Sequence, residues 1–158
     1  MSFDSREFRD ALGRFATGVC VITFAPENGK PFGITVNSFA SVSLEPALVL
    51  WSLQNNSDVF DVIVNTERYA VNILGSEQRA LSDQYAKKGD HDLSPEHFSI
   101  GETGVPLLKN AIVTFECENE AQHDGGDHAI LVGRVLEMAN NPAGEPLLFV
   151  SGKYRELQ

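Results

Sequence analysis

A run of hydroxyl and amide side chains between positions 35 and 57 is the first group that could bind a ligand. It comprises Thr35, Val36, Asn37 and Ser38, followed by Ser41, Ser43, Ser52 and Ser57. Asparagine both donates and accepts hydrogen bonds, so it suits a planar ligand whose edges carry carbonyl and N–H groups. The hydroxyls, with a helix N-terminus expected at Ser57, suit a phosphate. The alternative is that these residues cap helices and close turns, a common role of serine and asparagine.

The second group is the sequence Gly-Gly-Asp-His at 125–128, which lies between two expected strands. Glycines allow a tight turn or a close approach of the backbone to a flat ligand. His128, at the start of the following strand, could hydrogen-bond such a ligand or a phosphate. One alternative is an ordinary hairpin with an exposed Asp-His pair. Another is a metal site that adds His123 and Asp124, but a turn rarely makes ligands converge, so no metal is expected.

A third group consists of the cations Arg79, Lys87 and Lys88. The chain is strongly acidic, with a formal net charge of −10, so a local cluster of cations could hold a phosphate. The alternative is that these side chains are solvated on a helix surface. The same net charge argues against a nucleic-acid partner, because binding phosphates needs an excess of Lys and Arg.

The elements that position these residues follow from hydrophobic periodicity. A helix is expected first, since Asp4 and Glu7 have capping-box spacing and Phe8, Leu12 and Phe15 share one face. Strands are expected over 19–25, 32–37, 47–53, 69–74, 112–118, 129–138 and 146–151. The strand 47–53 is apolar on both faces and is expected to be buried on both. Short helices are expected over 58–64 and 76–86, with a turn at 123–127 and a long loop over 87–106.

About seven strands, two or three short helices, no repeat and no linker predict one domain over residues 1–158. The pattern indicates a mainly β fold, an antiparallel, Greek-key-like barrel with short peripheral helices. It contains no GxGxxG or Walker A sequence, so a nucleotide would be bound without a Rossmann fold. No apolar run is long enough to span a membrane, and the N-terminus does not resemble a signal peptide. A cytoplasmic protein is therefore expected, with Cys20 and Cys117 as buried free thiols.

Several short motifs, taken in their order along the chain, resemble one known family. They are Phe15-Ala16-Thr17-Gly18-Val19, Gly33-Ile34-Thr35-Val36-Asn37-Ser38-Phe39, Ser41-Val42-Ser43-Leu44-Glu45-Pro46, Phe60, Val71-Asn72-Ile73-Leu74, Gly126-Asp127-His128 and Gly152-Lys153-Tyr154. The chain resembles the short-chain NAD(P)H:flavin oxidoreductases, the reductase components of two-component monooxygenases, which have a split-barrel FMN-binding fold. The resemblance implies a homodimer with two flavin sites near the subunit interface.

Site residues follow from the same resemblance. It implies that Thr35, Asn37 and Ser38 line the isoalloxazine and ribityl groups of FMN or FAD. Ser52, Leu53 and Ser57 would border the ribityl-phosphate arm, with charge from Arg79 or Lys88. The implied cofactor-binding set also includes Val36, Ser41, Ser43, Gly126, Asp127 and Tyr154. His128 would be the residue that positions the nicotinamide.

The implied reaction is hydride transfer from NADH or NADPH to FMN or FAD, and the reduced flavin would serve a separate oxygenase. Such a reaction needs little acid–base chemistry from the protein, because the cofactors carry it. Two alternatives stay open. One is a flavin- or haem-binding barrel without reductase turnover, and the other is a reductase of another acceptor such as ferric iron or a corrinoid.

Overall fold

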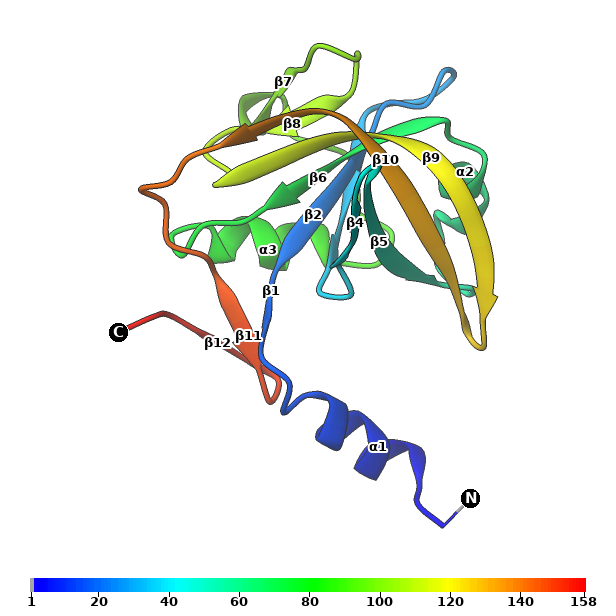
Figure 1. Cartoon of the computed structure of the whole chain (residues 1–158), viewed down its shortest axis with the longest axis vertical. Coiled ribbons are helices and arrows are strands. Elements are labelled where there is room, and N and C mark those ends of the chain that lie inside the picture. Colours follow the sequence, from blue (N-terminus) through cyan, green and yellow to red (C-terminus); the bar gives the residue numbers. More distant parts are fainter. Residues whose placement is uncertain (1) are drawn as a thin grey trace.

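The structure, a computed structural model, describes residues 2–158 and consists of a strongly curved antiparallel main sheet, two small sheets and short helices (Figure 1). The helices are α1 (Ser5–Leu12), α2 (Phe60–Val64) and α3 (Arg79–Tyr85), with the 3-10 helix η1 (Pro95–His97). The strands are β1 (Thr17–Gly18), β2 (Cys20–Phe24), β3 (Phe32–Val36), β4 (Ala40–Leu44), β5 (Ala47–Gln54), β6 (Arg68–Ile73), β7 (Phe98–Ile100), β8 (Pro106–Leu108), β9 (Val113–Gly125), β10 (His128–Asn140), β11 (Leu148–Val150) and β12 (Lys153–Arg155). The mainly β fold is confirmed.

Seven strands form the main sheet in the order β3-β2-β6-β9-β10-β5-β4. The sheet curls until its two halves face each other across a shared core. Trp51 of β5 packs edge-on against Tyr69 of β6, with ring centroids 5.8 Å apart, and lies 6.2 Å from Phe24 of β2. The curled sheet does not close, because β3 and β4 remain at its two edges.

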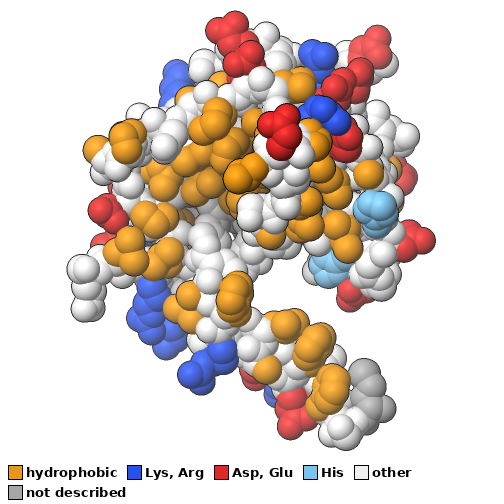
Figure 2. Space-filling model, viewed as in Figure 1, with side chains coloured by type: hydrophobic (Ala, Val, Ile, Leu, Met, Phe, Trp, Pro, Cys, Tyr) orange, Lys and Arg blue, Asp and Glu red, His pale blue; other side chains and the backbone are white. Residues whose placement is uncertain are grey.

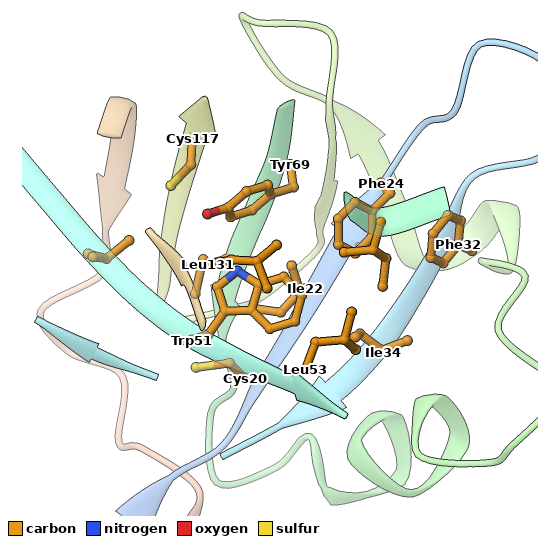
Figure 3. Packing of buried hydrophobic residues seen from close by; sticks show 13 residues of the cluster. Cys20, Ile22, Phe24, Phe32, Ile34, Trp51, Leu53, Tyr69, Cys117 and Leu131 are labelled. Carbon is orange, nitrogen blue, oxygen red and sulfur yellow. The ribbon is translucent and has the colours of Figure 1, made fainter. Parts of the chain in front are cut away.

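The interior of the barrel is filled by large apolar side chains (Figure 3). Cys20, Ile22 and Phe24 point into this cluster from β2, and the intervening Val21 packs into a second cluster on the outer side of the sheet. Strand β2 is therefore buried on both faces, since all five of its residues are buried. Such burial explains why it reads as a continuous apolar run.

The expectation for the strand over 47–53 was wrong in one respect. Along β5 the residues Val49, Trp51 and Leu53 are buried, and Leu48 and Leu50 between them are only partly covered. An apolar composition alone cannot distinguish a strand covered on both sides from one with an apolar outer face.

Other boundaries differ from the sequence-based expectation because polar strands were overlooked. The serine-rich stretch after Ser38 contains β4, and the expected loop over 87–106 contains η1 and β7. Strands β9 and β10 run on to a tight turn, so the turn over 123–127 was placed too early. Gly126 has φ of 72° in that turn, a conformation that favours glycine. Ser57 does not cap α2, which begins at Phe60.

Helix α1 begins at the expected capping box, where the Asp4 carboxylate accepts the Glu7 amide and the Glu7 side chain accepts the Asp4 amide. It extends away from the barrel, and none of its residues is buried (Figure 1). The apolar stripe of α1 thus contacts little of its own chain. No helix within residues 2–158 has both the length and the apolar character needed to cross a membrane.

Candidate functional site

The site begins with two strand edges that the main sheet leaves unpaired. Strand β3 pairs with β2 on one side only. On the other side of the opening, β4 pairs with β5 only as far as Leu50, so the last residues of β5 have a free edge. Backbone N–H and C=O groups along such edges need partners. We call this opening between β3 and the end of β5 the split.

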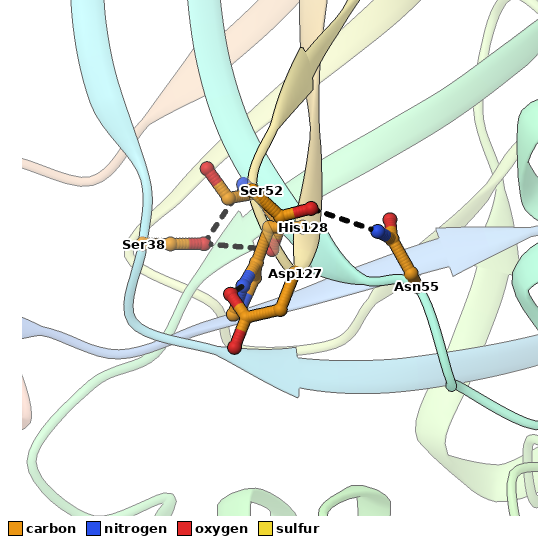
Figure 4. Close-up of polar contacts among 6 residues, drawn as sticks. Ser38, Ser52, Asn55, Asp127 and His128 are labelled. Carbon is orange, nitrogen blue, oxygen red and sulfur yellow. Dashed lines mark hydrogen bonds and ion pairs between the residues drawn. The ribbon is translucent and has the colours of Figure 1, made fainter. Parts of the chain in front are cut away.

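Ser38 links the two sides of the split. Its hydroxyl accepts a hydrogen bond from the Ser52 amide at 2.9 Å and donates one to the Ser52 carbonyl at 3.0 Å (Figure 4). One side chain thus replaces a step of the missing strand ladder. Beyond this link the two edges separate and leave room for a ligand.

A cleft of about 380 Å³ occupies that space, within the range of about 300–1,000 Å³ typical of small-molecule sites. Its walls are the end of β3, the end of β5 with the turn after it, the end of α3 with the following loop, and the start of β10. The lining residues are Ile34, Thr35, Val36, Asn37, Ser38, Ser52, Leu53, Gln54, Asn56, Ser57, Asp58, Tyr85, Ala86, Lys88, His91 and His128.

His128 enters the cleft from the start of β10, where it pairs with Gln54 of β5. Its Nδ1 lies 2.7 Å from the Oδ1 atom of Asp127 (Figure 4). A carboxylate only accepts hydrogen bonds, so Nδ1 carries the proton and Nε2 is left for a ligand. The hydrogen bond and positive charge of His128 lower the pKa of the Asp127 carboxyl, which keeps it an acceptor.

Nine of the predicted site residues meet in this cleft: Thr35, Val36, Asn37, Ser38, Ser52, Leu53, Ser57, Lys88 and His128. Within this set the Thr35 hydroxyl donates to the Ser82 carbonyl at 2.7 Å, so it binds α3 to β3. The Ser57 hydroxyl accepts the Val59 amide at 3.4 Å. Their binding roles remain predictions.

The other predicted residues lie outside the cleft lining. Ser41 and Ser43 belong to the edge strand β4, and Gly126 and Asp127 form the turn beside His128. Arg79 and Tyr154 contact each other instead, with the Arg79 guanidinium 4.8 Å from the centre of the Tyr154 ring. The Tyr154 hydroxyl also hydrogen-bonds Ser82 and Asp83, so this cluster fastens β12 to α3.

Sequence reasoning missed several residues of the cleft, among them Asn56, Asp58, Tyr85 and His91. Asn56 and Asp58 belong to a polar turn directly after β5, and this position at the end of a buried strand was a usable signal. His91 lies in a polar loop with no periodicity, so nothing in the sequence marked it. Within residues 2–158 no three His, Cys, Asp or Glu side chains are placed to hold a metal ion.

A second groove, of about 800 Å³, lies between α1 and the barrel. Asn37 and Ser38 line both this groove and the cleft, so the two cavities adjoin. The groove has a more apolar wall, which includes Leu12, Phe15 and Phe149.

The donor set of the cleft suits a flavin. Free strand edges and Asn37 offer donors and acceptors to a planar ring with carbonyl and N–H edges. Ser57 and Lys88 offer a hydroxyl and a cation to a phosphate. His128 offers one ring nitrogen to a second ligand.

Comparisons with known proteins agree with this geometry. The family described as flavin reductase like domain matches residues 12–158. The FMN reductase (NADH) SmoA of Agrobacterium fabrum is 42% identical over 151 residues, which are 96% of this chain and 85% of that protein. The reductase subunit HsaB of a flavin-dependent monooxygenase of Rhodococcus jostii is 33% identical over 99% of this chain and 80% of its own.

Solved structures show the same fold. The NADH:FAD oxidoreductase SgcE6 of Streptomyces globisporus, in complex with NAD and FAD fragments, superposes with a TM-score of 0.92 at 32% identity. The superposition covers 98% of this chain and 93% of that one. Two further relatives are longer, and this chain spans 45% and 42% of them. With a match over residues 12–158 and relatives of similar length above 30% identity, the chain belongs to the flavin reductase like family.

Proposed function

We propose that the protein is an NAD(P)H:flavin oxidoreductase that transfers hydride from NADH or NADPH to FMN or FAD. The observation that carries this proposal is the cleft in the split, where two free strand edges face each other and His128 stands beside them. A flavin bound there supplies the hydride acceptor, and a nicotinamide supplies the donor. The residues of the chain therefore only need to bind, orient and exclude water.

Each part of the cleft has a distinct role in this proposal. The free backbone edges and Asn37 orient the flavin ring and stabilise the negative charge that reduction places on it. Ser57 and Lys88 hold the phosphate end. The Nε2 atom of His128, free because Asp127 occupies Nδ1, hydrogen-bonds the nicotinamide and holds it against the flavin.

The direct test is an assay of NADH and NADPH oxidation in air with excess FMN, FAD or riboflavin. Catalytic loss of absorbance at the nicotinamide band in the presence of flavin supports the proposal. A protein that binds flavin but does not turn over would instead be a carrier or sensor. Turnover with ferric iron or a corrinoid, and not with flavin, would assign it to another acceptor.

We further propose that the reduced flavin passes to a separate oxygenase, because a relative such as HsaB is the reductase subunit of a flavin-dependent monooxygenase. Adding an oxygenase component to the assay should couple NADH oxidation to substrate oxygenation. The free thiols of Cys20 and Cys117 support a cytoplasmic site of action, where cysteines stay reduced.

A homodimer is the assembly that we propose. Helix α1 exposes Phe8 and Leu12, and Phe15, which follows the helix, is 80% exposed. Figure 2 shows that hydrophobic side chains follow this helix. On the edge strand β4, Val42 and Leu44 are exposed as well. Large apolar side chains exposed in this way favour burial in a protein interface. Since the groove beside α1 adjoins the cleft, each flavin site would lie near that interface.

A further inference from the structure

The side of the cleft opposite the Ser38 link is closed by a second contact across the split. The Asp58 carboxylate accepts the Gly89 amide at 2.8 Å through Oδ2, and its Oδ1 lies 3.0 Å from Nε2 of His91. Gly89 has φ of 80°, a conformation that glycine adopts without strain. We call Asp58, Gly89 and His91 together the Asp58 latch.

The far end of the same segment is fastened to the opposite wall. The Gly33 amide donates to the His91 carbonyl at 2.9 Å, and the Leu93 amide donates to the Pro31 carbonyl at 2.9 Å. Residues 91–93 therefore cover the start of the free edge of β3. Asp58 follows β5, so the segment 87–93 bridges the split from the β5 side to β3.

Two links thus bound the cleft. Ser38 joins the end of β3 to β5, and the Asp58 latch joins the turn after β5 to the loop on the start of β3. Lys88 immediately precedes the latched Gly89 and lines the cleft between the two links. The position of its ammonium group therefore depends on how firmly Asp58 holds the loop.

The charge of Asp58 bears directly on phosphate binding in the cleft. Asp58 also lines the cleft, and a bare carboxylate there would repel a phosphate. Partial burial acts to raise the pKa of Asp58, but the hydrogen bond and charge of His91 and the Gly89 amide outweigh it and lower the pKa. Both carboxylate oxygens are engaged by donors of the loop. The same loop also carries the charged residues Lys88, Asp90 and Asp92, and Asp92 faces Lys30.

We propose that Asp58 is a positioning residue that holds the loop 87–91 across the split, so that Lys88 faces the phosphate end of the cleft and the protein selects phosphorylated flavins over riboflavin. The inference rests on the proposed function of the cleft as a flavin site. A free carboxylate at this position would weaken phosphate binding. In the proposed arrangement the Asp58 carboxylate instead makes phosphate binding selective, because it holds Lys88 in place.

The test measures dissociation constants of FMN and riboflavin by quenching of flavin fluorescence, with steady-state KM and kcat. We expect Lys88→Met to weaken FMN binding roughly tenfold and to change riboflavin binding little, because a hydrogen bond to a charged group contributes at least that much. We expect Asp58→Ala to have the same signature, with a much larger effect on KM for FMN than on kcat. Asp58→Asn, which still accepts the Gly89 amide, should restore much of the preference for FMN.

A double-mutant cycle sharpens the test. If Asp58 acts through Lys88, Asp58→Ala should have no further effect on FMN binding in the Lys88→Met background. Hydrogen exchange of residues 87–93 in the flavin-free protein should be faster in Asp58→Ala than in the wild type. The matched control is Asp90→Ala, which removes an exposed negative charge from the same loop outside the latch and should not weaken FMN binding.

Tighter FMN binding by Asp58→Ala would show that charge repulsion dominates, and it would overturn the proposal. An equal loss of affinity for FMN and riboflavin would also overturn it, because it would mean a general collapse of the cleft. In both cases the wild-type protein still binds flavin and the proposed function stands. A wild-type protein that binds neither flavin would overturn the proposed function, and this inference with it.

Discussion

At the scale of single residues, the hydrogen bond to Asp127 determines which ring nitrogen of His128 can bind a ligand. The Asp127 carboxylate occupies Nδ1 at 2.7 Å, and the ring reaches into the cleft from a strand end paired with β5. In this geometry Nδ1 carries the proton, and Nε2 is left for a ligand. A histidine prepared in this way can orient a carboxamide or phosphate through Nε2, and it need not exchange a proton during hydride transfer.

Replacing His128 by alanine should separate nicotinamide use from flavin binding. We expect kcat/KM for NADH to fall on the order of tenfold or more in His128→Ala, because misplacing a reactant is costly. The dissociation constant of FMN should change little. Asp127→Asn keeps an acceptor for Nδ1, so its kcat/KM for NADH should lie between the values of the wild type and His128→Ala. Stopped-flow reduction of bound FMN checks this, and an unchanged KM and kcat for NADH would remove His128 from the mechanism.

The two cysteines illustrate the opposite case, residues whose surroundings suppress chemistry. Burial raises the pKa of Cys20 to about 12, and burial with the nearby Glu116 raises that of Cys117 to about 12. Neither thiol therefore ionises near neutral pH. We expect no reaction with iodoacetamide at pH 8 in the folded protein and complete labelling of both after unfolding in urea. Rapid labelling of the native chain, read by mass spectrometry, would contradict the barrel core described above.

At the scale of elements, the split is the region that the local sequence predicts least well. The periodicity located β2, β3, β5 and β6 because each is a compact apolar run. It missed β4, whose serines resemble a loop, and it overestimated the burial of β5. Asn37 and Ser38 were identified from their chemistry and order. Asp58 and His91 were not, because they meet across 33 positions of sequence and only the curled sheet brings them together.

The Ser38 link should contribute measurably to stability, because one hydroxyl satisfies two backbone groups of β5. We expect Ser38→Ala to lower the free energy of unfolding by about 1–3 kcal/mol, the cost of leaving such groups unpaired. Flavin affinity should fall as well, since the two walls of the cleft lose a link. Urea unfolding and fluorescence titration measure these effects. Ser99→Ala, in an exposed part of β7, is the control and should alter neither.

At the scale of the whole molecule, α1 is the element that most directly supports the proposed dimer. Its capping box is formed and its apolar side chains share a stripe, yet none of its residues is buried in the chain. A helix of eight residues gains little stability from its own hydrogen bonds. In the proposed dimer, packing against a second copy of the chain supplies the rest, and that copy offers the same stripe in return.

A charge placed in that stripe should dissociate the proposed dimer. Leu12 is 58% exposed, so Leu12→Glu removes little packing within the chain but puts a carboxylate into the interface. We expect a monomer by light scattering after gel filtration, with weaker flavin binding because the groove adjoins the cleft. Ile100→Glu on β7, where Ile100 is 60% exposed, is the matched control at the far end of the molecule in Figure 1. A dimer that survives Leu12→Glu would contradict the assignment of α1 to the interface.

The incomplete closure of the main sheet affects the stability of the flavin-free protein. Without a ligand, main-chain groups along the split are hydrogen-bonded to water or to another strand. An exposed edge of this kind can pair with strands of other proteins. A ligand bound in the split covers these edges. Because it binds only the native state, the melting temperature rises with the ligand concentration. Flavin supply in the cell would then govern the abundance of the reductase as well as its rate.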